Sequence, residues 1–413
     1  MAEHKNLLTL MDFIFTEQMD SLPAEYEWGL AVQAKYWGRI AEAWRKSEPI
    51  NWNSFAGTPE IFLAMDIPSI MQEALSVAVC SLPDKSNERY IDIAQENLVA
   101  DHVCSTQKIM IGAAISGDLP PPTTIVHPAQ PCDSTVVTYP IISEYLGVPH
   151  FSLDIPTWKD ERAIQYVADE IERMVAFLEE HTGKKLEYER LRTVMEYSNA
   201  AHDYNLKMNE LTKMVPCPIR QLMGAVLMSA AGTPECVEFY KSLYERAKSR
   251  VEQGRGPLPQ EKVRLAWFST WLAHDLELLR WLEDEFGAIV VNTLLGTDTT
   301  PLAEDISSTR KIMEALARKL LNAPMARECW GTLEHWFDYA IPACRDWKVD
   351  AAILTLHIGC KNMWAVSKLL KDKLADEVGI PTMVVEADFC DGRVFSSDGV
   401  RAQLSDFFNT MLV

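Results

Sequence analysis

Apolar strands and amphipathic helices follow one another in the same order in both halves of this chain. This repeat limits the folds that the chain can adopt. In the first half, "PPPTTIVHP" and "VPHFSLDIP" predict strands on either side of a helix in "DSTVVTYPIISEYLG". In the second half, "DAAILTLHIG" and "IPTMVVEADF" predict strands around the helix "KNMWAVSKLLKDKLADEVG". Such alternation is typical of parallel sheets covered by helices. We therefore expect an α/β protein with two Rossmann-like domains, each a doubly wound parallel sheet.

Helical regions precede and separate these two domains. Residues 1–50 have apolar residues spaced by three and four, as in "WGLAVQAKYWGRIAEAWRK". A second helical pattern follows the first domain and ends at the linker "EQGRGPLPQE". The predicted units are an N-terminal helical region (1–50), a first Rossmann-like domain (51–158), a helical region (159–256) and a second Rossmann-like domain (257–413).

The charge of the chain argues against two classes of partner. Its net charge is −20, whereas binding to nucleic acid or to an anionic membrane needs a basic surface. The first residues, "MAEHKNLLTLMDFIF", lack the basic start and the cleavage site of a signal peptide. No apolar run approaches the roughly 18–20 residues that span a bilayer. We expect a cytoplasmic protein that binds neither nucleic acid nor membrane.

The spacing of the nine cysteines limits what they can bind. No C-x-x-C motif occurs, which argues against zinc ribbons and ferredoxin-type clusters, whose ligands lie close together in sequence. Disulfides are not expected in a reducing cytoplasm. Any metal site must therefore be assembled by the fold from distant loops.

Three cysteines follow directly on predicted strands: Cys132, Cys360 and Cys390. Ligands of parallel α/β sheets gather at the carboxyl ends of strands, so these side chains are expected at one edge of each sheet. Cys104 and Cys329 each lie early in a helical stretch that leads to Cys132 or Cys360. Scattered thiolates in a dry cleft favour soft metals and iron–sulfur clusters. If the domains face each other, six thiolates can meet: Cys80, Cys104 and Cys132 from the first half, and Cys329, Cys360 and Cys390 from the second.

Free cysteines can also be ordinary core residues, because cysteine often behaves as a small buried hydrophobe. We prefer that interpretation for Cys217, Cys236 and Cys344. It also remains open for Cys80, whose segment "ALSVAVC" fits a helix interior.

Three residues beside the cysteines are candidates for proton transfer: His127, His357 and Lys361. Strand-end histidines bonded to the backbone and a solvated lysine are the alternatives. No G-x-x-x-x-G-K-[ST] and no G-x-G-x-x-G motif occurs, so nothing in the sequence is typical of ATP hydrolysis or of dinucleotide binding.

Several of these motifs resemble the 2-hydroxyacyl-CoA dehydratase and benzoyl-CoA reductase family. They are the "PC" after the first-domain strand, "GCK" at 359–361 and "EADFCDGR", in the same order of elements over nearly the whole chain. The resemblance implies two Rossmann-like domains, an intervening helical region and an iron–sulfur cluster between the domains. It also implies that a separate ATP-hydrolysing activator, with its own [4Fe-4S] cluster, delivers the electrons.

Two departures from the dehydratase pattern point to one branch of that family. Dehydratase subunits hold one [4Fe-4S] cluster through cysteines that match Cys104, Cys132 and Cys360, and this chain has three more. Where dehydratases tend to have a proline–glutamate–asparagine stretch, this chain has "DIPSIM", with no carboxylate after the proline. The double-cubane cluster proteins are the most similar branch, which implies a homodimer with an [8Fe-9S] cluster that reduces small molecules.

We therefore predict the iron–sulfur oxidoreductase component of an ATP-dependent, low-potential reductase. The alternative is a lyase-type subunit of a 2-hydroxyacyl-CoA dehydratase, or a benzoyl-CoA reductase subunit, with a single [4Fe-4S] cluster. Ser54, in "NWNSFAG", would then contact the acyl-CoA substrate. A scaffold that carries a cluster without turnover and a cofactor-free α/β protein are the remaining interpretations.

Overall fold

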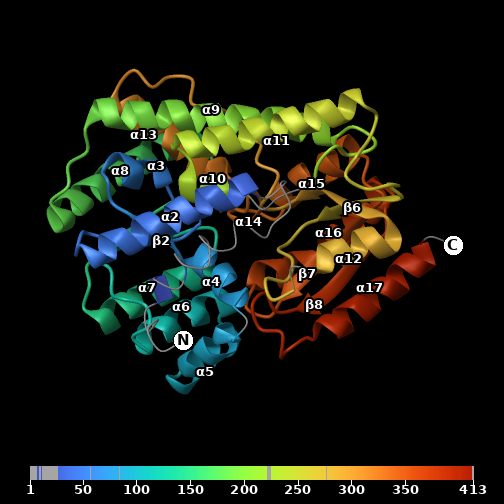
Figure 1. Ribbon diagram of the computed structural model, residues 1–413, viewed down its shortest axis with the longest axis horizontal. Coiled ribbons are helices and arrows are strands. Elements are labelled where there is room, and N and C mark those ends of the chain that lie inside the picture. The colour runs from blue at the N-terminus through green and yellow to red at the C-terminus, as the bar shows by residue number, and fades with distance from the viewer. Residues whose placement is uncertain are drawn as a thin grey trace.

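Two four-stranded parallel sheets form the centre of the computed structural model, and helices cover them (Figure 1). The structure describes residues 7, 8, 11, 27–55, 57–82, 84–220, 225–275 and 277–411. The predicted α/β class is therefore confirmed. The predicted N-terminal helical region is helical over α2 (Glu27–Arg45), and most of the preceding residues lie outside the described part.

The first sheet has the strand order β2-β1-β3-β4. Asn51 pairs with Ser69 on one side and with Thr124 on the other, and every pairing is parallel. The pattern over residues 51–68, "NWNSFAGTPEIFLAMDIP", indicates one short strand. The chain forms a strand and a short helix there, and a second strand follows directly at residues 69–71. The elements are β1 (Asn51–Asn53), α3 (Pro59–Ala64), β2 (Ser69–Met71), α4 (Gln72–Cys80), α5 (Ser86–Glu96), α6 (Ser105–Ile115), β3 (Thr124–Pro128), α7 (Asp133–Leu146) and β4 (His150–Leu153).

The second sheet repeats that arrangement with the order β6-β5-β7-β8, so the predicted repeat holds at the level of topology. Its elements are β5 (Val263–Trp267), α12 (Leu278–Phe286), β6 (Ala288–Thr293), α13 (Thr309–Asn322), α14 (Ala326–Cys329), α15 (Glu334–Asp346), β7 (Ala351–His357), α16 (Lys361–Glu377), β8 (Thr382–Ala387) and α17 (Ser397–Met411). One part of the repeat fails, because Cys104 precedes the long helix α6 whereas Cys329 ends the short helix α14.

Each sheet has a topological switch point, between β1 and β3 in the first and between β5 and β7 in the second. The chain leaves the central strand for one neighbour and later returns to the other side. The connecting segments therefore diverge at the carboxyl ends of these strands, and ligands of open α/β sheets bind at that position.

A helical region joins the two sheets, and its helices α9 (Tyr188–Thr212) and α11 (Pro234–Glu252) run across the top of Figure 1. The same region contains α8 (Glu161–Thr182) and the short helix α10 (Ala225–Ala230). Although α13 lies between two strands of the second sheet in sequence, it packs on α8 beside the first sheet. The two halves therefore share one apolar core, formed where α13 packs on α8. This core holds the halves together at a place separate from the cysteines.

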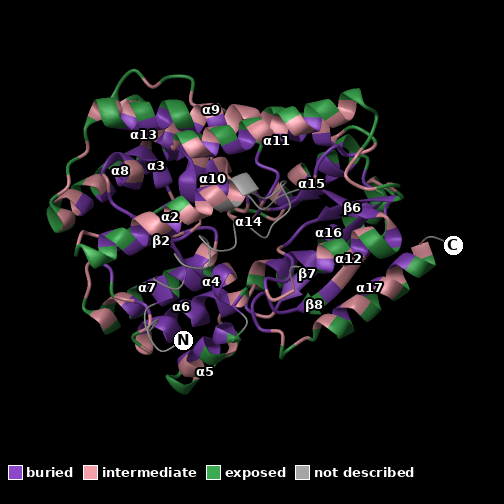
Figure 2. Ribbon diagram, viewed as in Figure 1, coloured by how far each residue is buried: buried purple, intermediate pink, exposed green. Residues whose placement is uncertain are grey.

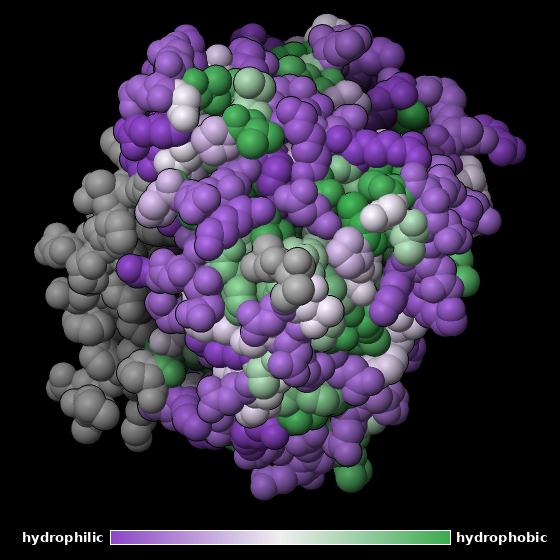
Figure 3. Space-filling view, turned by 90° about the vertical axis from the view of Figure 1, so that its right-hand side faces the viewer, coloured by the Kyte–Doolittle hydropathy of each residue, from purple (hydrophilic) through white to green (hydrophobic). Residues whose placement is uncertain are grey.

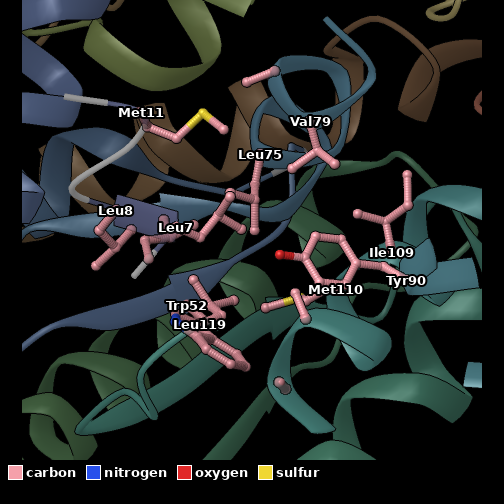
Figure 4. Close-up of a cluster of buried hydrophobic side chains, with 14 of the residues drawn as sticks. Leu7, Leu8, Met11, Trp52, Leu75, Val79, Tyr90, Ile109, Met110 and Leu119 are labelled. Atoms are coloured by element: carbon pink, nitrogen blue, oxygen red, sulfur yellow. The ribbon is translucent and has the colours of Figure 1, made fainter. Parts of the chain in front are cut away.

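Alternating strand residues place an apolar core on each side of each sheet. In β3, Ile125 faces the core built with α4 to α7, whereas Val126 faces the core built with α3, α8 and α13. The inner strands of both sheets, β1, β3, β5 and β7, are buried along their whole length, as Figure 2 shows for β7. Figure 4 shows Leu7 and Met11 grouped with Leu75 of α4 and Trp52 of β1, so the first described residues are part of this core.

The outer surface is mainly hydrophilic, which agrees with the net charge of −20. Figure 3 shows a face on which hydrophilic side chains surround separate hydrophobic patches. Within the described ranges, no helix is long and apolar enough to cross a membrane.

Candidate metal centre between the domains

Three of the predicted cysteines occupy the same local position, the N-cap of a helix. Cys104 caps α6, Cys132 caps α7 and Cys360 caps α16. The last two helices start just past β3 and β7, so these cysteines lie at the carboxyl ends of the strands as expected. A helix N-terminus presents unpaired backbone N–H groups and a partial positive charge, which favours an anion.

The two domains are in direct contact at these N-termini. A β-carbon added to Gly359 would lie 2.3 Å from Cα and 2.5 Å from the backbone N of Cys104, so only a glycine fits there. Beside it, Lys361 Nζ donates a hydrogen bond to Asp133 Oδ2 at 2.7 Å. This bond joins the first turn of α16 to the first turn of α7, and it brings Cys132 and Cys360 to the same junction.

The remaining three predicted cysteines surround this junction. The Cys80 Sγ, at the end of α4, lies 3.9 Å from the carbonyl oxygen of Cys390. The Cys390 backbone N donates to Ser105 Oγ at 3.1 Å, directly next to Cys104. The backbone carbonyl of Cys329 accepts a hydrogen bond of 3.2 Å from the Asn362 amide, two residues after Cys360. All six are therefore brought together.

Their grouping differs from the division by halves that the sequence suggested. Cys80 and Cys390 come from different halves, and they lie together on the side of Cys104. Cys329 interacts electrostatically with Cys360 of its own half and with Cys132 of the other. Each candidate trio therefore mixes both halves, because the domain contact places α4 beside the loop after β8.

Burial dominates the acid–base properties of five of these thiols. It raises the pKa of Cys104 to about 11 and also raises the pKa values of Cys132, Cys329, Cys360 and Cys390. Charge repulsion from Cys104 raises the pKa of Cys132 further. These five thiols are thus neutral unless a cation lies among them, and iron is such a cation.

The donor set fits an iron–sulfur cluster better than a single metal ion. Over the described ranges, no three His, Cys, Asp or Glu side chains surround one point closely enough to hold one ion. Each thiolate of an iron–sulfur cluster binds a different iron, so its ligands stand apart around a larger volume. Sulfur donors that line a buried junction suit that chemistry.

The three cysteines expected in apolar cores are indeed there. Cys217 and Cys344 belong to the core of the second sheet, and Cys236 belongs to the core of the helical region. Their side chains are almost fully buried, and they are not part of the junction.

The structure places the proton-transfer candidates in three different environments. His127 is buried between the rings of Tyr139 and His150, at centroid distances of 4.7 and 5.1 Å. Burial lowers its pKa to about 4, so the ring is neutral near pH 7. His357 is also buried, and its Nε2 lies 2.8 Å from the Thr270 carbonyl oxygen. Lys361 is exposed and ion-paired with Asp133.

A carboxylate that the sequence reasoning missed lies next to the cysteines. Glu73 accepts hydrogen bonds from Ser54 Oγ at 2.9 Å and from the Phe55 backbone N at 3.0 Å. Burial raises its pKa to about 7, and Glu73 in turn raises the pKa of Cys132. The signal for Glu73 in the sequence was a glutamate at the start of α4. It was missed because β2, the strand directly before α4, was not predicted. The carboxylate absent directly after Pro68 is thus supplied by Glu73, two residues past the end of "DIPSIM".

Taken together, the fold and the site define a class: a two-domain parallel α/β protein with a thiol-lined junction at its two switch points. The comparisons with known proteins agree with that class. The family model for the D-component of 2-hydroxyglutaryl-CoA dehydratase matches residues 57–411. The chain belongs to this 2-hydroxyacyl-CoA dehydratase family, as the motifs predicted.

Characterised relatives are similar along most of their length. The alpha subunit of (R)-phenyllactyl-CoA dehydratase from Clostridium sporogenes is 23% identical, over 86% of this chain and 88% of the relative. A benzoyl-CoA reductase subunit from Thauera aromatica is 22% identical, over 75% and 76%. The alpha subunit of lactoyl-CoA dehydratase from Anaerotignum propionicum is 20% identical, over 86% and 89%. Each relative is named as one subunit of its enzyme, so this chain is related to enzyme components of both lyase and reductase type.

Proposed function

We propose that this chain is the iron–sulfur component of an ATP-dependent, low-potential reductase of small molecules. It would hold a double-cubane [8Fe-9S] cluster through Cys80, Cys104, Cys132, Cys329, Cys360 and Cys390. The observation that carries the proposal is the convergence of six thiols from both halves on one junction. Such a cluster supplies electrons one at a time at low potential.

The surroundings of the thiols suit a bound anionic cluster. Hydrogen bonds from the backbones of Thr106, Ser134 and Met363, each in the first turn of a capped helix, lower the pKa values of the three N-cap thiols and oppose the effect of burial. The N-termini of α6, α7 and α16, each capped by one of these cysteines, add partial positive charge beside the thiols. Both effects favour thiolates and cluster sulfides over neutral thiols.

The two mixed trios support two cubanes rather than one. Cys80, Cys104 and Cys390 form one neighbouring group, and Cys132, Cys329 and Cys360 form the other. Three protein thiolates per cubane leave one corner of each for a shared sulfide. The single-cluster alternative uses only the three N-cap cysteines and gives the other three no part.

Glu73 is the group best placed to move a proton near the thiols. Burial raises the pKa of its carboxyl group to about 7, toward the range in which general acids work best at neutral pH. Ser54 donates to one carboxylate oxygen and keeps the group in place. Lys361 is a second candidate because it is exposed beside Cys360. His127 and His357 are buried and neutral, so they are less suited than Glu73 and Lys361 to exchange protons with solvent.

Electrons would come from a separate ATP-hydrolysing activator that docks over α7 and α16. Both helices start directly after a candidate ligand and carry exposed apolar side chains within their first three turns: Val136, Val137 and Ile141 on α7, and Trp364 on α16. Such side chains are typical of protein interfaces. Because this chain is strongly acidic, a basic rim on the activator would complement it. A homodimer and a cytoplasmic location complete the proposal.

The alternative function is that of a dehydratase or benzoyl-CoA reductase subunit with one [4Fe-4S] cluster and an acyl-CoA substrate. The observation that favours it is the Ser54–Glu73 pair beside Cys132, a hydroxyl and a carboxyl group ready to contact a substrate. The dehydratase relatives favour it as well.

Iron and acid-labile sulfide per chain, measured on anaerobically purified protein, separate the two functions. The double cubane predicts about eight irons, falling in Cys80→Ala, Cys329→Ala and Cys390→Ala alike. The matched control is Cys344→Ala, a buried cysteine outside the junction, which should keep the full iron content. About four irons, unchanged by all of these substitutions, would contradict the double cubane and favour the dehydratase-type subunit.

A further inference from the structure

A cavity of about 250 Å³ beside the first sheet is separate from the thiols but reaches toward them. Its lining comes from α2, α3, β2 and the α9–α11 region. Asn53, at the end of β1, and Met71, at the end of β2, form its wall on the side of the candidate metal centre. Ser54 directly follows Asn53, and Glu73 lies two residues after Met71. This wall of the cavity is therefore at most two residues along the chain from the Ser54–Glu73 pair.

The inner end of the cavity carries an unpaired hydrogen-bond acceptor. The Asn53 side chain is 4% exposed, and its Oδ1 has no hydrogen-bond partner in the protein. Its backbone carbonyl is already used, accepting a bond of 2.7 Å from the Tyr139 hydroxyl. A buried amide oxygen without a partner is costly, so a ligand with an O–H or N–H group would satisfy it.

The middle of the cavity is apolar, and several of its walls come from the protein core. Ile40, Phe62, Ile67 and Met71 line it and are all buried. A carbon skeleton would fit between them and lose its contact with water, which stabilises binding. The volume lies below the roughly 300–1,000 Å³ of sites for drug-sized ligands, so the cavity suits a small molecule.

The outer end is surrounded by cations. Arg39, Lys184 and Arg190 all approach the single carboxylate of Asp66, at 3.3, 3.1 and 3.6 Å. Arg39 also contacts Glu48 at 2.7 Å. Arg190 lines the cavity, and its side chain is 50% exposed. Three cations for two carboxylates leave a local surplus of positive charge on a chain whose net charge is −20.

We propose that this cavity binds a small organic carboxylate with an apolar body and a hydroxyl or N–H group at its opposite end. The carboxylate would lie near Arg39 and Arg190, and the donor would face Asn53 Oδ1. That such a ligand is the substrate rests on the proposed function, since its donor end lies nearest Glu73 and the thiols. The binding itself does not depend on electron transfer.

Calorimetric titration of the anaerobically purified protein with three para-substituted benzene derivatives tests this assignment. 4-Hydroxybenzoate has all three features, 4-methylbenzoate lacks the donor and 4-hydroxybenzamide lacks the charge. We expect 4-hydroxybenzoate to bind about five-fold more tightly than 4-methylbenzoate, as one hydrogen bond gives. Asn53→Ala should abolish that preference. Arg190→Gln should weaken binding of the two carboxylates and not that of the amide.

Arg192→Gln is the matched control, because Arg192 is an exposed arginine of the same helix that pairs with Glu189 and Glu196 away from the cavity. Absence of saturable binding, or binding that neither Asn53→Ala nor Arg190→Gln changes, would overturn the proposal. Reduction without carboxylate binding would remove only the cavity assignment, and binding in a protein that reduces nothing would remove only the proposed function.

Discussion

Gly359 and Cys104 are in contact through their backbones, although they lie on different domains. The second half of the molecule meets the first at this point, because a β-carbon on Gly359 would be 2.3 Å from the Cys104 Cα. No flexible side chain can move away to relieve that clash. The distance between the thiols of Cys104 and Cys360 therefore depends on the absence of one methyl group.

Substitution of Gly359 by alanine should force the domains apart at the candidate metal centre. We expect a loss of about 1–3 kcal/mol in the free energy of unfolding, as for other overpacked sites. Iron content should fall as well, because the thiols of the two domains no longer share one cluster. Gly399→Ala serves as the control, since its new β-carbon would meet only the Ser396 hydroxyl, at 3.2 Å. Full iron content in Gly359→Ala would show that the domain contact does not shape the site.

Removal of the Lys361 charge should affect turnover and not folding. The ion pair with Asp133 is solvent-exposed, with side-chain exposures of 71% and 54%, and such pairs contribute little to stability. Lys361→Gln should therefore unfold at nearly the wild-type denaturant concentration and retain its iron. If Lys361 delivers protons, the rate of substrate reduction should fall several-fold. An unchanged rate at several pH values would leave Lys361 only a surface role.

His127 should make the protein sensitive to acid. Burial lowers its pKa from 6.5 to about 4 in the folded state. The unfolded chain binds the proton first, so this stabilisation is complete above pH 6.5 and is lost as the pH falls toward 4. His127→Phe preserves the ring stack with Tyr139 and removes the titration. Between pH 7 and 5.5, the free energy of unfolding, measured with urea, should decrease by about 1 kcal/mol less in His127→Phe than in the wild type. Parallel pH profiles would refute this account.

Arg264 should be essential for attaching the helical region to the second sheet. Its guanidinium donates to the carbonyl oxygens of Trp347 at 2.8 Å and Thr212 at 2.9 Å, and it pairs with Glu261 in a buried site. Arg264→Leu leaves the Glu261 carboxylate buried without its partner. We expect a loss of about 3–5 kcal/mol in the free energy of unfolding. The double variant with Glu261→Leu should recover part of it, which a denaturant titration can measure.

Polar substitutions on α7 should weaken electron delivery without disturbing the cluster. Val137 and Ile141 are each 56% exposed on the helix that begins at Cys132. In Val137→Asn and Ile141→Asn, the activator concentration that gives half-maximal reduction should rise several-fold, while iron content and the electron paramagnetic resonance spectrum stay the same. Tyr197→Asn on α9, an exposed aromatic residue on a different helix, should behave like wild type. Equal behaviour of all three variants would place the docking surface elsewhere.

Local properties of the sequence were sufficient for the class of fold and for the edge of the sheet on which the cysteines lie. Apolar periodicity depends on neighbouring residues, so the strand before Cys132 and the strand before Cys360 were both predicted. The helix between β3 and β4 was predicted too, although it continues through Pro140, where the sequence indicated an interruption. The same reasoning placed Cys217, Cys236 and Cys344 in apolar cores. It failed at β2, where three residues are too few to show a period.

Contacts between residues far apart in sequence were decided by the tertiary structure. Cys80 neighbours Cys390, and Gly359 fits against Cys104, only because the two sheets dock at their switch points. Glu73 reaches Ser54 because β1 and β2 pair side by side, a register that neither segment specifies alone. The physical reason is that the docking of the two sheets depends on all the packing contacts of their shared core. The apolar periodicity of the sequence, in contrast, describes each helix or strand separately. The sequence thus identified the thiols, and the packing of the two domains determined which of them are neighbours.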